Sequence, residues 1–246
     1  MSRRTFTEAW EAVAAVDGWM THGQAQALYD AAARVPAGGR IVEIGSFRGR
    51  STIVLASAAA DGVEIVAIDP HAGNDRGPQE IDGYAAEAAT DHEVFNRNLA
   101  EAGVAQRVRH VRAFSDAAHG EVEGDIDTLY IDGAHRYAPA RADIRDWGNR
   151  VPPGGTMLIH DSFSSVGVTL AIVRQLLFGN TFRYVGRSRS LTEYRAEAPP
   201  SRVAIAVRQL AQLPWFANNL LVKVLLTVKL GGLLRRVTGR QPEWPY

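Results

Sequence analysis

Residues 40–60 read RIVEIGSFRGRSTIVLASAAA, and this stretch contains the junction that decides the fold. Its first six residues have the apolar pattern of a strand, Gly45 and Gly49 bracket a turn, and residues 50–60 favour a helix. Glycine tolerates unusual φ values and lets a ligand approach the backbone closely. The free N–H groups at the start of a helix attract an anionic group. The stretch therefore predicts a strand, a ligand-binding turn and a helix.

The same alternation continues along the chain. Further strands are expected at 63–69, 107–113, 126–132 and 156–161, helices at 91–103, 139–151 and 166–178, and a closing pair of strands in TFRYVG and LTEYRAE. Strands separated by helices predict a doubly wound, mostly parallel α/β sheet over residues 38–198. Capping-box patterns at 5–8 and 21–24 predict helices within residues 1–37. Ligands should bind where the parallel strands end.

Two of the expected helices show a periodic apolar face. In the first, the face consists of Ala140, Ile144, Trp147 and Val151; in the second it consists of Val166, Leu170, Val173 and Leu177. Both sets follow helical spacing, so both are expected to point into the core.

Composition limits the class of protein. The chain has 246 residues, 46% of them hydrophobic and 22% charged, which suits one large α/β domain with an appendage. It has no cysteine, which excludes disulfides and thiolate chemistry and fits a reducing cytosol. A formal net charge of zero gives no reason to expect nucleic acid as a partner. With no signal-like start and no uninterrupted apolar run long enough to span a bilayer, a cytoplasmic protein is expected.

The charge is nevertheless uneven. From Ser201 onward there are seven Lys or Arg and one acid, a net charge of +6 that the rest of the chain balances. Residues 199–246 therefore predict a basic, apolar helical tail. Such a helix suits the interface of an anionic membrane at the inner face of the cell, and it equally suits packing against the main domain or against a second subunit in a homo-oligomer.

Acidic residues stand at the ends of three expected strands. Asp69 follows the second strand, about 20 residues after the glycine turn, where a carboxylate can accept both hydroxyls of a ribose. Asp132 and Asp161 end two strands expected to be neighbours, and two carboxylates that close need a proton or a cation between them. Mg²⁺ prefers such oxygen ligands. His135 can face the same space and has a pKa suited to taking a proton from a hydroxyl group.

The segments VEIGSFRGRST, VAIDPH and DTLYIDGAHRY…VPPGGTMLIHDSF resemble class I S-adenosylmethionine-dependent methyltransferases. Within that class they are most similar to the metal-dependent O-methyltransferases that act on catechols and macrolide sugars. The resemblance covers about residues 38–195 and implies a class I methyltransferase fold with S-adenosyl-L-methionine as cofactor, Mg²⁺ as metal and a small-molecule hydroxyl acceptor. The residues it implies for the cofactor are Glu43, Gly45, Ser46, Gly49, Ser51, Asp69, Ser115, Asp116 and Asp132. It implies His135 as the general base and Asp132, Asp161 and Ser162 as metal ligands.

The sequence departs from the catechol-type pattern at two positions. Ser162 stands where those enzymes have an Asn ligand, and His160 stands where some sugar enzymes have an acid. His160 is expected to be a packed, hydrogen-bonded strand residue rather than a ligand. The polar segment 71–93 is expected to be a loop above the donor site, in which His71 or Tyr84 contacts an acceptor, or else a mobile insertion.

Two other functions remain open from the sequence. An NAD-type oxidoreductase shares the strand, turn, helix and ribose acid, although the E-x-G-x-x-x-G spacing differs from its G-x-G-x-x-G. A nucleoside-binding scaffold without catalytic activity shares them too, although Asp132, His135 and Asp161 on one rim favour an enzyme.

Overall fold

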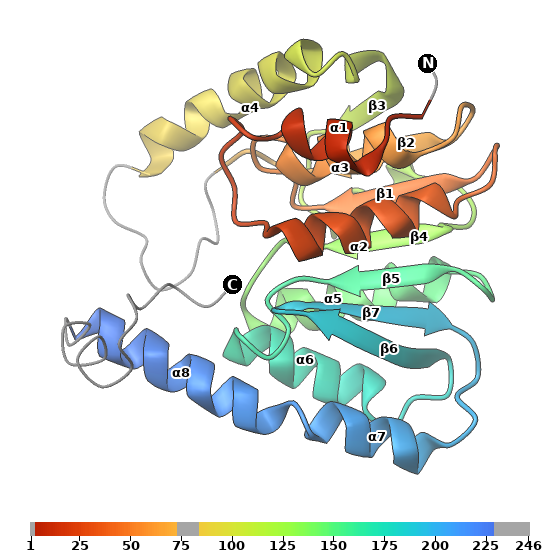
Figure 1. Cartoon of the computed structure of the whole chain (residues 1–246), viewed down its shortest axis with the longest axis vertical. Helices are drawn as coiled ribbons and strands as arrows, with labels where there is room; N and C mark the ends of the chain where they lie inside the picture. Colours follow the sequence, from red (N-terminus) through yellow and green to blue (C-terminus); the bar gives the residue numbers. More distant parts are fainter. Residues whose placement is uncertain (1–2, 73–83, 229–246) are drawn as a thin grey trace.

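In the computed structural model, which describes residues 3–72 and 84–228, helices cover both faces of a seven-stranded sheet (Figure 1). The strands are β1 (Arg40–Ile44), β2 (Glu64–Ile68), β3 (Val108–Val111), β4 (Thr128–Ile131), β5 (Thr156–Ile159), β6 (Phe182–Ser188) and β7 (Leu191–Ala196). Their order is β3-β2-β1-β4-β5-β7-β6. The first five strands pair in parallel, while β7 is antiparallel to both β5 and β6. The predicted doubly wound, mostly parallel sheet is therefore confirmed, and the strand order reverses between β1 and β4.

The α-helices are α1 (Phe6–Glu11), α2 (His22–Ala33), α3 (Arg50–Ala58), α4 (Tyr84–Glu101), α5 (Tyr137–Asp146), α6 (Val166–Leu176), α7 (Arg202–Leu210) and α8 (Leu213–Thr227). Both predicted capping boxes are present, with Thr5 at the start of α1 and Thr21 at the start of α2. Residues of α2, α3 and α4 build the core on one face of the sheet. Residues of α5, α6 and α7 build the core on the other face, and Trp215 and Phe216 of α8 pack against it.

The predicted face of α5 is confirmed, and the predicted face of α6 is partly wrong, although Leu177 is buried as expected. All four predicted residues of the first set, from Ala140 to Val151, are buried. On α6, however, Val166 and Leu170 are 50% and 52% exposed, while Ala171 and Ile172 are fully buried. Because α6 is apolar on several sides, its sequence supports more than one periodic face, and packing selects another.

The expected loop at 71–93 is also partly wrong, because α4 already begins at Tyr84. The segment from 84 to 90 is alanine-rich and lacks an apolar period, so its strong helix propensity was the only available signal. The side chain of Tyr84 and the predicted loop residues 73–83 lie outside the described part of the chain. In the described ranges, no helix combines the length and the apolar character that crossing a membrane requires.

Candidate active site

The turn after β1 is built for close approach of the backbone to its surroundings. Gly45 has a φ of 87°, and a Cβ atom there would overlap the carbonyl oxygen of Asp132. Gly49, also at φ 87°, is the N-cap of α3. Ser46 between them is 2% exposed, and its hydroxyl has no hydrogen-bond partner within the described protein. A buried polar atom without a partner is costly, so Ser46 is suited to receive a polar group from a ligand.

Glu43 lies beneath this turn and is fully buried. The hydroxyl groups of Ser51 and Thr52 at the start of α3 donate to its two carboxylate oxygens. Burial raises the pKa of Glu43 to about 8, against the effect of these two hydrogen bonds. Glu43 and Ser51, both predicted to surround the cofactor, are therefore bonded to each other and hold the strand to the helix that follows it.

Asp69 follows β2, and its carboxylate links the turn after β1 to the turn after β2. Its carboxylate accepts the backbone N–H of Phe47 at 2.8 Å and that of His71 at 2.7 Å. His71 itself is buried, and its Nε2 lies 2.6 Å from the carbonyl oxygen of Phe47. Its ring packs against His92, Phe95 and His110. The side chain of His71 therefore joins two turns instead of standing in a loop above the site.

Ser115 and Asp116, predicted near the adenine, follow β3. The Ser115 hydroxyl donates to Asp143 of α5 at 2.6 Å, whereas the Asp116 side chain is exposed. Asp143 is 4% exposed, and burial raises its pKa to about 6 although the Ser115 hydrogen bond acts in the opposite direction. Asp143 was not predicted as a site residue, because a single acid inside an amphipathic helix carries no distinguishing pattern.

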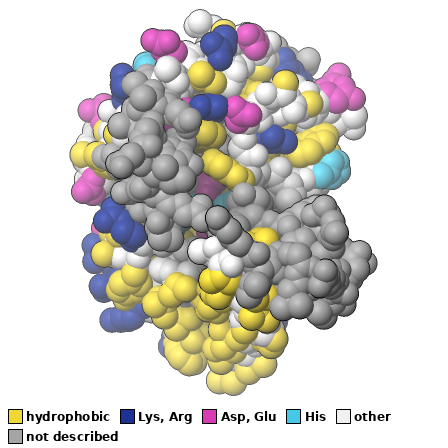
Figure 2. Space-filling model, turned by 90° about the vertical axis from the view of Figure 1, so that its left-hand side faces the viewer, with side chains coloured by type: hydrophobic (Ala, Val, Ile, Leu, Met, Phe, Trp, Pro, Cys, Tyr) yellow, Lys and Arg dark blue, Asp and Glu magenta, His cyan; other side chains and the backbone are white. Residues whose placement is uncertain are grey.

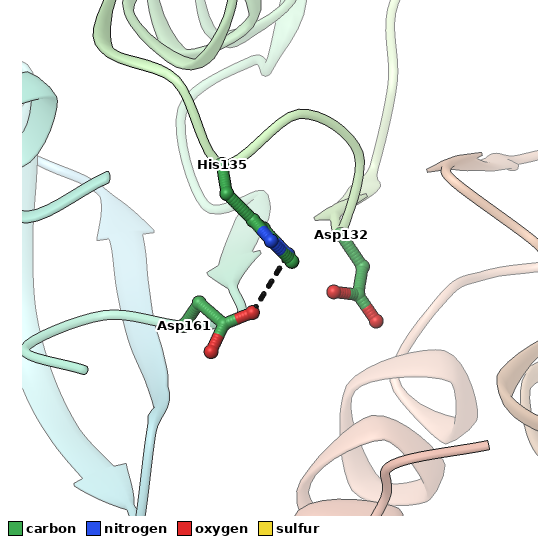
Figure 3. A group of neighbouring side chains, drawn as sticks. All are labelled: Asp132, His135 and Asp161. Atoms are coloured by element: carbon green, nitrogen blue, oxygen red, sulfur yellow. Dashed lines mark ion pairs between the residues drawn. The ribbon is translucent and has the colours of Figure 1, made fainter. Parts of the chain in front are cut away.

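Beyond β4 and β5, the structure brings Asp132, His135 and Asp161 together, as the sequence analysis expected (Figure 3). One ligand atom of each residue lies within 4.8 Å of those of the other two. Nε2 of His135 is 2.8 Å from Oδ2 of Asp161. Asp132 lies across from this pair and accepts the hydroxyl of Tyr130 at 2.7 Å. The loop that carries His135 is held close to α6, since a Cβ atom on Gly167 would overlap the carbonyl oxygen of His135.

The charges in this group stabilise one another. Burial acts to lower the pKa of His135, but the hydrogen bond and negative charge of Asp161 outweigh it and raise the pKa. Burial acts to raise the pKa of Asp161, but the nearby His160 and His135 hold it well below its usual range. Asp161 is therefore ionised near neutral pH, and it orients the His135 ring.

His160 is an additional member of the group. It is 4% exposed, and its Nδ1 lies 3.1 Å from Asp132 and 3.4 Å from Asp161, without alignment for a hydrogen bond to either. Gln24 of α2 faces its Nε2 at 3.3 Å and also donates to Ser190 at 3.1 Å. Because the Gln24 amide faces Nε2, we assign the proton of the His160 ring to Nδ1, between the two carboxylates. The expectation of a packed residue was right, but its place between both acids was missed.

Ser162 lies apart from this group. Its side chain is fully buried, and its hydroxyl donates to the carbonyl oxygen of Ile159 at 2.9 Å. It also shares a hydrogen bond of 2.7 Å with Thr192 of β7. The prediction of Ser162 as a metal ligand is therefore wrong for this geometry, because the hydroxyl already serves the junction between β5 and β7.

Together, this strand order, the glycine turn after β1 and the acid after β2 define the class I methyltransferase fold. Comparison with known families agrees: residues 42–162 match the model of a methyltransferase domain. The match extends from β1 to the residue after Asp161 and so spans the glycine turn, Asp69 and the group at the ends of β4 and β5.

Solved structures with the same fold have low sequence identity. The O-methyltransferase TomG from Streptomyces achromogenes, involved in tomaymycin synthesis and solved with SAM, has a TM-score of 0.52 and 19% identity, with 80% of this chain and 92% of TomG covered. The SAH-bound methyltransferase PaMTH1 from Podospora anserina has a TM-score of 0.55 and 18% identity, with coverages of 78% and 87%. At these identities the likeness concerns the fold.

One curated relative is an uncharacterised protein, y4gI, from Sinorhizobium fredii. It is 29% identical over 130 residues, which are 50% of this chain and 13% of that protein. The chain thus spans only a small part of this relative.

Proposed function

We propose that this protein is an S-adenosylmethionine-dependent O-methyltransferase that acts on a hydroxyl group of a sugar, a glycolipid or a related small metabolite. The observation that carries the proposal is the meeting of Asp132, His135 and Asp161 at the rim that also holds the glycine turn. Support comes from the methyltransferase domain match and from the names of TomG and PaMTH1. These point away from the alternative of an NAD-type oxidoreductase.

The residues at the cofactor end suit the parts of S-adenosylmethionine. The backbone of the turn at Gly45, which packs closely on Asp132, and the partnerless hydroxyl of Ser46 would receive the methionine portion. The Asp69 carboxylate, which is partly exposed, would accept the ribose hydroxyls. Ser115 and Asp116 would lie toward the adenine. Glu43, which is fully buried beneath the turn, would hold the turn in place through its hydrogen bonds with Ser51 and Thr52.

His135 would be the general base. Its Nε2 donates a hydrogen to Asp161, which leaves Nδ1 to accept the proton of the acceptor hydroxyl. The acceptor oxygen then attacks the methyl carbon while the bond from that carbon to sulfur breaks. The products are the methyl ether and S-adenosylhomocysteine, with the proton on His135. The protein contributes mainly the positioning of the two reactants and of this base.

The donor set also fits a divalent cation. Two carboxylates and an imidazole lie within 4.8 Å of one another, and Asp132 and Asp161 would hold the ion. When bound, Mg²⁺ would stabilise the negative charge that develops on the acceptor oxygen. The His160 ring already lies between the same two acids, so a cation would have to bind on the side of the carboxylates that faces away from His160.

Substitution of the base tests the proposal. His135→Ala should keep S-adenosylmethionine binding within about twofold of wild type, yet lower turnover by about 10²–10⁴-fold, because it removes proton transfer but none of the cofactor contacts. Binding is measured by calorimetry, and turnover by S-adenosylhomocysteine release with a panel of sugars and glycolipids.

His119→Ala is the matched control, since His119 stacks on Trp147 and is not a member of the group of Asp132, His135 and Asp161. It should leave turnover unchanged. Full turnover in His135→Ala would remove His135 from this role. Tight cofactor binding by the wild type without turnover on any acceptor would favour the scaffold.

A further inference from the structure

The outer sides of α7 and α8 carry an apolar stripe. We define the outer stripe as Val203, Val207 and Leu210 on α7 with Leu221, Val224 and Val228 on or directly after α8. Their exposed fractions range from 41% to 72%. Within each helix they recur every three or four residues and so share one face. A surface helix of a globular protein normally turns polar residues outward, so this face is suited to an apolar surrounding.

The stripe lies within a region of one charge sign. Between Glu197 and Glu243 the sequence contains no Asp or Glu, whereas α7 and α8 carry Arg202, Arg208 and Lys223. The Arg208 guanidinium donates to the carbonyl oxygen of Val185 and lies over the ring of Tyr184. The surface is therefore apolar with cations beside it and without anions on either helix.

The inner side of α8 is attached to the candidate active site. The side-chain amide of Asn219 donates to the carbonyl oxygen of Phe163 at 3.0 Å, and the Lys223 amine donates to that of Ser164 at 2.9 Å. Both carbonyls belong to the turn that begins at Asp161. Figure 2, which looks onto the ends of the parallel strands, shows hydrophobic side chains gathered at the end of the molecule where α8 lies, with Lys and Arg beside them.

We propose that the outer stripe lies in the interface of an anionic membrane, so that α8 holds the active-site turn next to the lipid head groups. Apolar side chains would enter the boundary of the acyl chains, and the exposed Arg202 and Arg208 of α7 would meet anionic head groups, whereas Lys223 stays on the inner side of α8. Isologous pairing with a second copy fits less well, because it would place these cations near one another with no acid from either helix. Membrane docking itself does not depend on the proposed function; only its use for reaching a lipid-borne acceptor does.

Vesicle flotation of the full chain tests the proposal. The vesicles are phosphatidylcholine alone, or phosphatidylcholine and phosphatidylglycerol in equal parts. Wild type should float with the mixed vesicles and bind much less to phosphatidylcholine alone. Leu221→Ser with Val224→Ser removes two apolar side chains without changing charge, and should weaken binding to the mixed vesicles about tenfold or more.

The matched control is Asn218→Ser with Thr227→Ser, which changes two exposed polar residues of the same helix and should bind within about twofold of wild type. Val203→Ser with Val207→Ser provides a second stripe variant on α7. Thermal unfolding verifies that each variant folds. The proposal is overturned if the wild type does not float with the mixed vesicles. It is also overturned if both stripe variants bind these vesicles as well as the wild type does. A wild-type dimer in light scattering that the stripe variants convert to a monomer identifies the stripe as a subunit interface instead.

Discussion

Asp161 is the residue on which the candidate site depends most. It adopts a left-handed φ of 53°, lies two residues after the end of β5, bonds His135 and lies beside His160. A non-glycine residue in this conformation costs of order 1–3 kcal/mol, and such strain persists only where the surroundings hold it. Here two histidines stabilise the ionised carboxylate.

Metal removal separates two versions of the mechanism at this residue. If Asp132 and Asp161 hold Mg²⁺, EDTA should abolish most turnover and added Mg²⁺ should restore it, because the acceptor oxygen loses its electrostatic stabilisation. The measurement is S-adenosylhomocysteine release before and after chelation, with Ca²⁺ as a control ion. Turnover that is indifferent to EDTA would assign the chemistry to the His135–Asp161 pair alone.

Gly45 offers a prediction about the cofactor turn. In Gly45→Ala the new methyl group would overlap the carbonyl oxygen of Asp132, so the turn must shift, and cofactor affinity should fall by about tenfold or more. Gly154→Ala is the control: its φ is similar at 89°, but nothing lies within 4 Å of the new atom. It should lose some stability and keep its affinity in calorimetry. Equal affinities would show that the close approach at Gly45 is unimportant.

Asp143 offers a prediction about pH. Its pKa is about 6 in the folded protein against 3.8 for an ordinary Asp, so the folded state holds the proton more tightly. Stability should therefore fall as pH rises from about 4 to about 6, by at most about 3 kcal/mol. Asp143→Asn keeps an acceptor for Ser115 and should be more stable than wild type above pH 6, with the difference vanishing below about pH 4.

Urea unfolding across this pH range measures the difference. Asp146→Asn on the same helix is the control, because Arg145 lowers the pKa of Asp146 and the carboxylate there is partly exposed. It should bring no gain at high pH. Parallel pH profiles for wild type and Asp143→Asn would contradict the buried-acid explanation.

The residues that could be found from sequence are those at strand ends. Asp69 and Asp132 follow apolar strands directly, His135 and Asp161 come within four residues of a strand end, and parallel strands bring their carboxyl ends to one edge. His160 and Asp143 could not be assigned in this way, because their partners come from α2 and from the loop after β3. Ser162 was misassigned since sequence does not show that β7 lies beside β5.

At the scale of elements, α2 supports the site from outside the methyltransferase domain match. Gln24 is fully buried, contacts His160 and donates to Ser190, so it fixes the His160 ring at its Nε2. Gln24→Leu should lower kcat while leaving the KM for S-adenosylmethionine nearly unchanged, and it should cost about 1–3 kcal/mol of stability by leaving buried polar atoms unpaired.

Gln26→Leu is the matched control, because Gln26 is on the same helix and bonds the exposed Asp30. Gln26→Leu should change neither kcat nor the free energy of unfolding by much. Steady-state kinetics and urea unfolding provide the two measurements. If Gln24→Leu loses stability but keeps its kcat, Gln24 serves the fold and does not position His160.

Elements with one dominant signal were predicted well. The first five strands, both capping boxes and the buried side of α5 agree with the structure because alternation, caps and a single apolar face determine them. The start of α4 and the buried side of α6 do not agree. In the first case a polar, alanine-rich segment has no periodicity, and in the second apolar residues occur on several sides.

At the scale of the whole molecule, the sequence predicted the layers but not the edge of the sheet. Alternating strands and helices indicate parallel pairing through right-handed crossovers, which leaves few possible arrangements for β1 to β5. The closing pair of strands was expected from its own pattern. Its insertion, with β7 between β5 and β6, depends on contacts such as Thr192 with Ser162, and no local signal encodes these.

That insertion has a consequence for how the protein is made. The hydrogen bond from Gln24 to Ser190 links an early helix to the hairpin between β6 and β7, 166 residues later. On a translating ribosome, the glycine turn and the strands of the first parallel pairs emerge before that hairpin does. The hydrogen bonds that join Gln24 to both His160 and Ser190 cannot all form until that hairpin has emerged. A nascent chain stalled after β5 would therefore contain the glycine turn but lack the Ser190 contact that helps to fix Gln24 against His160.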